Sequence, residues 1–312
     1  MTDPSAPAAS QPVLPPVPPP VQPEQPEPPV TRRQRREQEA ARARQAKAGR
    51  NLPAAVTVGL LLLGGALVGL IWLPVVLAIL VIALLLLGVT ETAQAISRRG
   101  LDVPRVPLWA GAVAMPLGAF AGGVEALVLA LLGTLLLVLV WAVVEDLPAR
   151  GESVMASAFI VLWVPFLLSF AIALLGQEQG NLMVACMLLM VVSNDTFGYI
   201  VGASFGKHPM APKISPKKSW EGFAGSVTGS VLVGTAAVHL FLDHPWWVGS
   251  LLGLLTVASA TAGDFAESMI KRELNLKDMG SMLPGHGGAM DRLDSLVFSA
   301  PVAYMVFALP FV

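Results

Sequence analysis

The chain has 312 residues, of which 54% are hydrophobic and 13% are charged, and its formal net charge is −1. Long apolar runs with so few charges exclude a soluble core and indicate a protein that crosses the membrane several times. The only cysteine, Cys186, excludes an internal disulfide and a zinc site built from cysteines. The sequence gives no sign of a soluble domain or of a convincing internal repeat.

The first 50 residues form a polar tail in two parts. Residues 1–30 are rich in Pro, Ala, Gln and Glu and lack the apolar stretch of a cleavable signal peptide. This composition predicts a disordered segment that is partly polyproline II. Residues 31–50 are strongly basic, which indicates either a positive flank that orients the first span or a helix on anionic headgroups.

The apolar stretches predict an all-α polytopic membrane protein with about nine transmembrane helices. The predicted spans are 54–73, 75–90, 107–121, 124–145, 153–175, 181–202, 221–242, 245–263 and 293–312. The connections on one side are very short, so the first eight spans are expected to pair as four tight helical hairpins. Pro74 is expected to be the turn of the first hairpin, with a kink in one long span as the alternative.

The basic residues select one orientation in the membrane. With the N-terminus in the cytoplasm, all 20 Lys and Arg residues fall in cytoplasmic segments. None then lies in the outer loops near Pro74, Gly123, Glu178 and Asp243. The positive-inside rule therefore predicts a cytoplasmic N-terminus.

The first five spans contain few polar residues. Glu125, Glu145 and Asp146 lie near span ends and are interpreted as solvated borders. Glu91, at the cytoplasmic end of the second span, lies on the same side as the polar patches that follow. It is therefore a candidate for lining a headgroup site.

The first of three polar patches lies in residues 193–207, at the cytoplasmic end of the sixth span. Asn194 and Asp195 lie about two turns inside that end, and Asp195 shares a helix face with Tyr199. A bare carboxylate at this depth costs about 2.5–3.5 kcal/mol, so it must face protein, water or a cation. Asp195 is either a functional group or a structural carboxylate paired with a lysine inside the bundle.

The second patch is residues 207–223, where three prolines exclude a continuous helix and predict a loop. Ser219, followed by Glu221, predicts a cap at the start of the seventh span, where free amides attract anions. The loop is either a phosphate-binding arm or an ordinary positive loop with a normal cap. Its basic residues are Lys207, Lys213, Lys217 and Lys218.

The third patch is residues 264–295, a dense polar block between two apolar spans. Charges at a membrane border are costly and by default mark function. The block begins with a polar helical stripe of Asp264, Glu267, Ser268 and Lys271. Lys277 and Asp278 follow in a loop, where Pro284 and the glycines around His286 allow sharp turns.

The block ends at the start of the last span, where Asp291 and Asp294 share a helix face beside Arg292. If the loop folds back, Asp264 can meet these two carboxylates. Two or three carboxylates together with phosphate oxygens suit Mg²⁺, which predicts a polyphosphate substrate with a metal ion bound beside it.

The third patch also carries a family resemblance. Residues 268–294, SMIKRELNLKDMGSMLPGHGGAMDRLD, resemble the signature of the phosphatidate cytidylyltransferase family, also called CDP-diacylglycerol synthases. The upstream segments ND…GY…G…FGK and SPKKSWEG resemble the family as well, so the likeness covers about residues 193–295. Ala289 departs from the pattern, which usually has a larger aliphatic residue at this position.

The resemblance implies an integral membrane enzyme of phospholipid biosynthesis that transfers CMP from CTP to phosphatidic acid. The products would be CDP-diacylglycerol and pyrophosphate, the cofactor would be Mg²⁺, and Asp264 and Asp291 would bind the metal with Asp294 close by. The expected location is the plasma or inner membrane with the active site facing the cytoplasm. The expected partners are the two substrates and the bilayer, with a possible homodimer and no nucleic acid.

The resulting site prediction has two parts. The residues expected to act in catalysis are Asp264, Lys271, Asp291, Arg292 and Asp294. The residues expected to bind substrate are Asn194, Asp195, Lys207, Lys217, Lys218, Ser219, Glu221, Lys277, Asp278, His286, Gly287 and Gly288. The chain is expected to divide into the tail 1–50, an N-terminal transmembrane region 51–180 and a C-terminal catalytic region 181–312.

The chemistry of the expected reaction agrees with these residue types. A lipid phosphate is already anionic and needs no Ser-His-Asp machinery, so catalysis would consist of positioning and charge neutralisation. The division of Lys217, Lys218, Lys271 and Arg292 between CTP and lipid stays open. Two alternatives also stay open: a CTP-dependent enzyme or kinase acting on another lipid, such as a polyprenyl or ether lipid, and a cation or phosphate transporter using Asp195 and Asp264.

Overall fold

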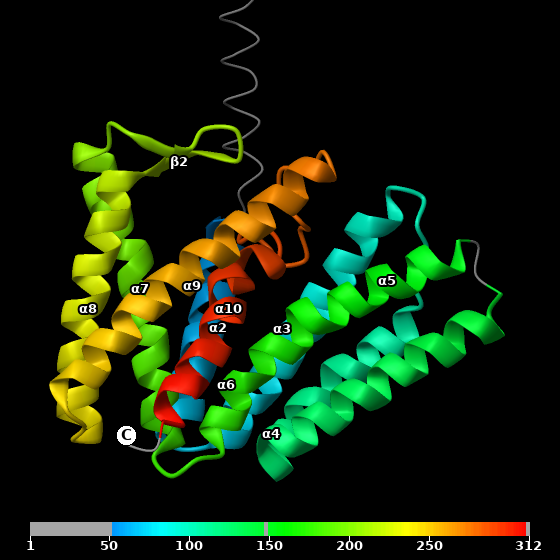
Figure 1. Ribbon diagram of the computed structural model, residues 1–312, viewed down its shortest axis with the longest axis horizontal. Helices are drawn as coiled ribbons and strands as arrows, with labels where there is room; N and C mark the ends of the chain where they lie inside the picture. The colour runs from blue at the N-terminus through cyan, green and yellow to red at the C-terminus, as the bar shows by residue number, and fades with distance from the viewer. Residues whose placement is uncertain (1–51, 147–148, 310–312) are drawn as a thin grey trace, which may run out of the picture. The chain divides into compact units, whose positions relative to one another are not determined.

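The computed structural model describes residues 52–146 and 149–309. The predictions for the tail, residues 1–50, lie outside the described residues. The described helices are α2 (Leu52–Ile71), α3 (Pro74–Ser97), α4 (Arg105–Val144), α5 (Arg150–Val161), the π-helical turn η1 (Leu162–Phe166), α6 (Leu167–Leu175), α7 (Gly180–Phe205), α8 (Trp220–Leu242), α9 (Trp246–Glu273) and α10 (Met290–Phe307). One short hairpin of β1 (Pro209–Ala211) and β2 (Ser215–Ser219) accompanies them (Figure 1).

Seven helices in the described ranges are long and apolar enough to cross a membrane. They are α2, α3, α4, the continuous helix formed by α5, η1 and α6, and then α7, α8 and α9. The last helix, α10, is not among them, because it carries Asp291, Arg292 and Asp294 near its start. The chain is thus an all-α, multi-pass membrane protein, as the composition predicts.

The longest helix, α4, is a hairpin of two antiparallel limbs. A straight helix of its 40 residues would be about 60 Å long, roughly twice the hydrocarbon thickness of a bilayer. The helix breaks at Gly122 and Gly123, and Gly123 has a φ of +63° that favours glycine. A Cβ on Gly111 would overlap the side chain of Thr134, which a straight helix would hold more than about 30 Å away. The predicted turn near Gly123 is therefore present.

Two further predicted turns are also present. Pro74 is the first residue of α3, and a Cβ on Gly69 of α2 would overlap Leu77 of α3. The two helices therefore pack side by side, and Pro74 belongs to a turn rather than to a kink. Asp243, which has a φ of +54°, directly follows the last residue of α8, and Pro245 directly precedes the first residue of α9. The two helices are therefore joined by a tight turn.

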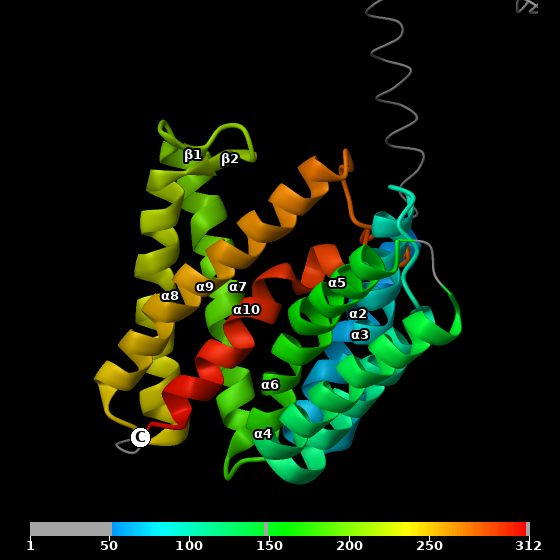
Figure 2. The same ribbon diagram turned by 45° about the vertical axis from the view of Figure 1, so that its right-hand side comes forward.

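The loop predicted for residues 207–223 is in part a β-hairpin, which the sequence reading did not anticipate. β1 pairs with β2 in antiparallel register, from Pro209 opposite Ser219 to Ala211 opposite Ser215. Prolines are tolerated in such a ribbon because each strand is an edge strand and one side of it needs no backbone donor. Figure 2 shows the hairpin at the ends of α7 and α8, above the helices.

Small residues allow α7, α8 and α9 to pack closely. A Cβ on Gly249 of α9 would overlap the backbone of Gly234 in α8, and a Cβ on Gly253 would overlap the carbonyl of Ser230. The hydroxyl of Ser226 in α8 donates to the carbonyl of Asn194 in α7 at 2.7 Å. Close approach at small residues and interhelical hydrogen bonds are the usual means of helix association in membranes. Together they fix the position of Asn194 against α8.

The crossing of α9 and α10 brings the third polar patch together. α9 extends to Glu273, about ten residues beyond the predicted span, which keeps the polar stripe helical. A Cβ on Gly263 of α9 would overlap the backbone carbonyl of Asp294 in α10. Asp264, the next residue after Gly263, and Asp294 therefore lie at the same helix crossing.

Candidate functional site

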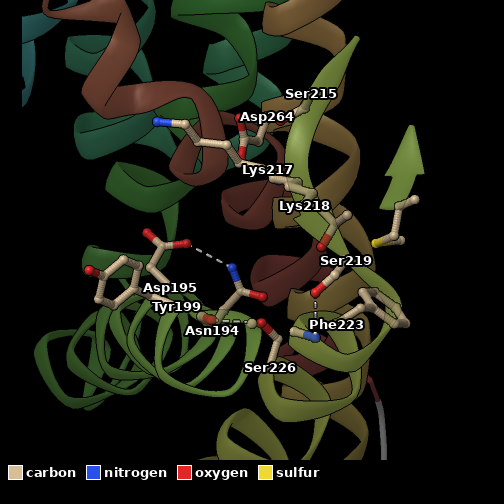
Figure 3. Close-up of a pocket in the computed structure, with 15 residues that line it drawn as sticks. Asn194, Asp195, Tyr199, Ser215, Lys217, Lys218, Ser219, Phe223, Ser226 and Asp264 are labelled. Atoms are coloured by element: carbon tan, nitrogen blue, oxygen red, sulfur yellow. Dashed lines mark hydrogen bonds and ion pairs between the residues drawn. The ribbon is translucent and has the colours of Figure 1, made fainter. Parts of the chain in front are cut away.

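A polar cavity of about 330 Å³ lies between α7, the β-hairpin, α8 and α9. Figure 3 shows side chains of α7 on one side of this cavity and side chains of β2 on another. The predicted site residues that line it are Asn194, Asp195, Lys217, Lys218, Ser219 and Asp264. The structure thus joins the first two polar patches with the start of the third.

Opposite charges face one another in the cavity. Lys218 of β2 forms an ion pair with Asp264 of α9, and its ammonium lies 4.8 Å from the ring centroid of Phe265. Asp195 accepts a hydrogen bond from the side-chain amide of Asn194 at 2.9 Å. Asp195 also interacts electrostatically with both Asp264 and Lys218. The cavity is therefore lined by carboxylate oxygens and by an ammonium group that lie close to one another.

The start of α8 adds backbone donors to the cavity. The Ser219 hydroxyl accepts from the amide of Gly222 at 3.1 Å, which confirms the predicted cap. Both residues line the cavity, so the positive end of the α8 dipole faces it. A phosphate in the cavity would therefore meet both a lysine and a helix N-terminus.

Glu221 fastens the base of the hairpin. Its carboxylate accepts from the amides of Lys207 and His208 at 3.1 and 3.2 Å and contacts the His208 ring at 2.6 Å. Neither Glu221 nor Lys207 lines the cavity, and Lys207 is exposed. Their predicted contact with substrate stays a prediction, while their visible contacts hold the hairpin that carries Lys217 and Lys218.

A second cluster centres on Asp291 at the start of α10. Its carboxylate accepts from the Lys271 ammonium at 2.9 Å and from the amides of Met279 and Gly288 at 3.2 Å each. Lys271 also pairs with Glu267, four residues before it on α9. The structure thus brings Lys271, Gly288 and Asp291 together, and their expected roles in catalysis and substrate binding stay predictions.

The loop between α9 and α10 folds back on itself beside this cluster. Leu283 and Gly287 form an isolated bridge, and Gly287 has a φ of +86°. The Arg292 guanidinium donates twice to the carbonyl of His286, at 3.0 and 2.7 Å. The ring nitrogen Nδ1 of His286 is buried and has no hydrogen-bond partner among the described residues, while the ring lies against Gly59 of α2.

Asp294 connects the cavity with the Asp291 cluster. It interacts electrostatically with Asp264 and Asp195, and Glu267 interacts in the same way with Asp294 and Asp291. A row of carboxylates therefore runs from α7 across α9 to α10, neutralised in part by Lys218 and Lys271.

The predicted Mg²⁺ ligands can be compared with the positions of these carboxylates in the structure. Within residues 52–146 and 149–309, no three His, Cys, Asp or Glu side chains are grouped closely enough to hold a metal ion. Asp264, Asp291 and Asp294 thus do not form one ligand group, and Asp264 and Asp291 pair with Lys218 and Lys271 respectively. Mg²⁺ usually takes only one or two carboxylates, with waters and substrate phosphates completing its octahedron. The donor set therefore fits Mg²⁺ without a cage of three protein ligands.

Some predicted site residues lie outside the cavity, and some residues that line the cavity were not predicted. Lys277 and Asp278 are exposed and do not line the cavity. Tyr199 and Thr261 line it without having been predicted. The four-residue spacing from Asp195 was the signal for Tyr199, whereas Thr261 follows only from its position one turn before Asp264.

Comparison with known proteins extends the likeness well beyond the polar patches. Residues 53–309 match the model of the cytidylyltransferase family. A phosphatidate cytidylyltransferase of Mycobacterium bovis is 36% identical over 277 residues, which is 85% of this chain and 90% of that protein. The enzyme of the same name from Mycobacterium leprae is 38% identical over 289 residues, covering 84% and 89%.

A more distant relative shares a shorter stretch. The phosphatidate cytidylyltransferase of Aquifex aeolicus is 37% identical over 155 residues, which is 50% of this chain and 58% of that protein. The matches to the mycobacterial enzymes and the family model both include the N-terminal helices, which carry few polar residues. The chain belongs to the cytidylyltransferase family.

Proposed function

We propose that this protein is a phosphatidate cytidylyltransferase, which transfers CMP from CTP to phosphatidic acid. The observation that carries the proposal is a set of carboxylates beside a polar cavity in a multi-pass membrane protein. Asp195 lines the cavity, Asp264 pairs with Lys218, and Asp291 pairs with Lys271. Membership of the cytidylyltransferase family supports the transfer of a cytidylyl group, and the names of the mycobacterial relatives support phosphatidate as the acceptor.

In this reaction a phosphate oxygen of phosphatidic acid attacks the α-phosphorus of CTP. The new bond joins that oxygen to the α-phosphorus, and the bond from the α-phosphorus to the oxygen bridging to the β-phosphorus breaks. The electron pair leaves with pyrophosphate. Because the attacking phosphate is already anionic, the protein has mainly to bring two polyanions together and hold them in line.

The residues of the cavity and the Asp291 cluster suit that task. Lys217 and Lys218 on the hairpin and the N-terminus of α8 supply positive potential to phosphates on the cavity side. Lys271 and Arg292 supply it on the α10 side. A bound Mg²⁺, held by Asp264 with Asp291 or Asp294, would neutralise phosphate charge during the transfer.

The finer topology belongs to the same proposal. The two limbs of α4 count as separate spans, and α10 completes the bundle after its charged first turns, which gives nine spans. The distribution of Lys and Arg places the N-terminus and the site on the cytoplasmic side of the plasma or inner membrane. In this arrangement residues 51–180 form an N-terminal transmembrane region and residues 181–312 the catalytic region, and a homodimer is the proposed assembly.

The direct test uses purified full-length protein in detergent with labelled CTP, phosphatidic acid and Mg²⁺. The expected products are lipid-linked CMP and pyrophosphate, with turnover lost in EDTA and restored by added Mg²⁺. Formation of a lipid pyrophosphate and CDP from the same mixture, or of a lipid phosphate and CDP when a lipid alcohol replaces phosphatidic acid, would instead indicate a lipid kinase. Full turnover in EDTA would contradict the metal assignment but not the transfer itself.

A further inference from the structure

Glu91 of α3 lies within the third polar patch in space, although it is remote from it in the sequence. Its side chain is almost completely buried, with 1% of the residue exposed. One carboxylate oxygen accepts from the amide of Met282 at 3.0 Å, and the other accepts from the amide of Met290 at 3.1 Å. These donors are 191 and 199 residues away in the sequence. A single side chain of the N-terminal helices thus binds the loop between α9 and α10 at two points.

Two glycines fit the loop closely around this carboxylate. A Cβ on Gly280 would overlap the Glu91 side chain. A Cβ on Gly288 would come within 2.9 Å of a Glu91 oxygen and would also meet a carboxylate oxygen of Asp291. Gly288 therefore lies between the two carboxylates, and its amide donates to Asp291 at 3.2 Å. The position of Asp291 relative to the loop depends on the same segment that Glu91 holds.

Burying the carboxylate of Glu91 costs hydration free energy, which an apolar side chain at the same position would not lose. In the part of the chain that the structure describes, no Lys or Arg forms an ion pair with it. A buried carboxylate without a cation depends on hydrogen bonds to offset its lost hydration. The two amide donors supply these bonds, and charge-assisted bonds of this kind are strong and directional. An apolar side chain of similar volume would pack without such a requirement but could not orient the amides.

We propose that Glu91 is a positioning residue that holds the loop from Met279 to Met290 in the form that presents Asp291 and Lys271. In this role Glu91 acts through the backbone of the loop and needs no contact with either substrate. The inference rests on the proposed function in one respect, namely that Asp291 serves in CMP transfer. The bonding role of Glu91 itself is independent of that function.

The first test is Glu91→Gln, with Thr92→Val as the matched control. Gln has nearly the same volume, but its NH₂ group would face one of the two amide donors, so one bond is lost. The Thr92 hydroxyl, equally buried on the same helix, donates within that helix to the carbonyl of Gly88 at 2.8 Å. We expect kcat to fall about 10–100-fold in Glu91→Gln, as for residues that orient a ligating group, with KM values less affected. Thr92→Val should keep its rate.

A second readout does not depend on activity. Hydrogen exchange of peptides covering residues 279–290 should accelerate in Glu91→Gln and not in Thr92→Val, because two loop amides lose or weaken their acceptor. Wild-type exchange together with wild-type kcat in Glu91→Gln would overturn the inference. If the wild-type protein makes no CDP-lipid, the proposed function fails, while the exchange data still decide whether Glu91 holds the loop.

A double-mutant cycle guards against the case in which a single variant folds poorly. Gly280→Ala should be harmful because its Cβ meets Glu91, but in a Glu91→Ala background the space is free. The combined loss of loop protection should therefore be clearly smaller than the sum of the two single losses. Simple additivity would contradict a direct contact between the two positions and with it the inference.

Discussion

Lys218 of the β-hairpin pairs directly with Asp264 of α9, so the cation of one polar patch neutralises the carboxylate of another. The two side chains are each about one-third exposed, at 28% and 31%, and both line the polar cavity. A substrate phosphate or a metal ion entering the cavity would compete with this pair. The pair therefore offers a direct way to test which residues handle the substrates.

We expect Lys218→Gln to lower kcat/KM about 10–100-fold, because a hydrogen bond to a charged group contributes roughly 1.5–3 kcal/mol. Lys213→Gln is the matched control, since Lys213 lies in the turn of the same hairpin, is exposed and does not line the cavity. Initial rates with CTP and phosphatidic acid varied in turn will also reveal which KM changes. Equal losses in both variants would indicate a general effect of hairpin charge instead of a local role.

Asp264→Asn and Asp291→Asn should each lower turnover at least about 100-fold, because each removes a charge expected to act on the reacting phosphates. Each variant keeps nearly the same shape, and folding is checked by gel filtration in detergent. Glu125→Gln, an exposed residue on the second limb of α4, serves as the control and should keep its rate. Near-normal turnover in a folded sample of either Asp variant would exclude that residue as a metal ligand.

Gly249→Val should destabilise the packing of α8 against α9, because its side chain would overlap the backbone of Gly234. Overpacking of this kind costs about 1–3 kcal/mol and should lower the thermal unfolding midpoint in detergent. Gly133→Ala on α4 is the control, since a Cβ there meets nothing within 4 Å and favours the helix. An unchanged midpoint for Gly249→Val would mean that the two helices are not held in such close contact.

Removal of residues 1–30 should leave CMP transfer largely intact, because a Pro-rich segment of this composition has no apolar surface with which to complete a site. The measurement is the same CTP turnover assay on full-length and shortened protein at matched purity. A large drop would show that the tail takes part in binding or assembly.

Much of the membrane architecture could be predicted because hydropathy and turn residues act locally. Pro74 and the Gly122–Gly123 pair mark turns that the structure contains, and the cap at Ser219 is present. The β-hairpin was missed because its few residues are mostly Pro, Lys and Ser, which carry no strand signal. Its pairing follows from the ends of α7 and α8, which the sequence alone does not bring together.

The candidate site was predictable in residue type but not in arrangement. Asp264, Lys271 and Asp291 stand out as charges at a membrane border, and the structure links Lys271 to Asp291. Asp264 was expected to lie beside Asp291, but in the structure it forms an ion pair with Lys218. This pair depends on how α9 lies against the hairpin, which no local sequence pattern encodes. Glu91 could be noticed as an acid on the same side of the membrane. Its hydrogen bonds with two loop amides could not be predicted, because the donors lie almost two hundred residues away in the sequence.

The two hydrogen bonds from the loop to Glu91 of α3 join parts of the chain that are synthesised at different times. Chains are made from the N-terminus, so α3 leaves the ribosome and can enter the bilayer long before Met282 and Met290 are added. The acceptor carboxylate of Glu91 is therefore synthesised well before the two amides that bond to it in the finished fold. A C-terminal fragment translated without α3 would have to finish its last loop with both amides lacking that acceptor.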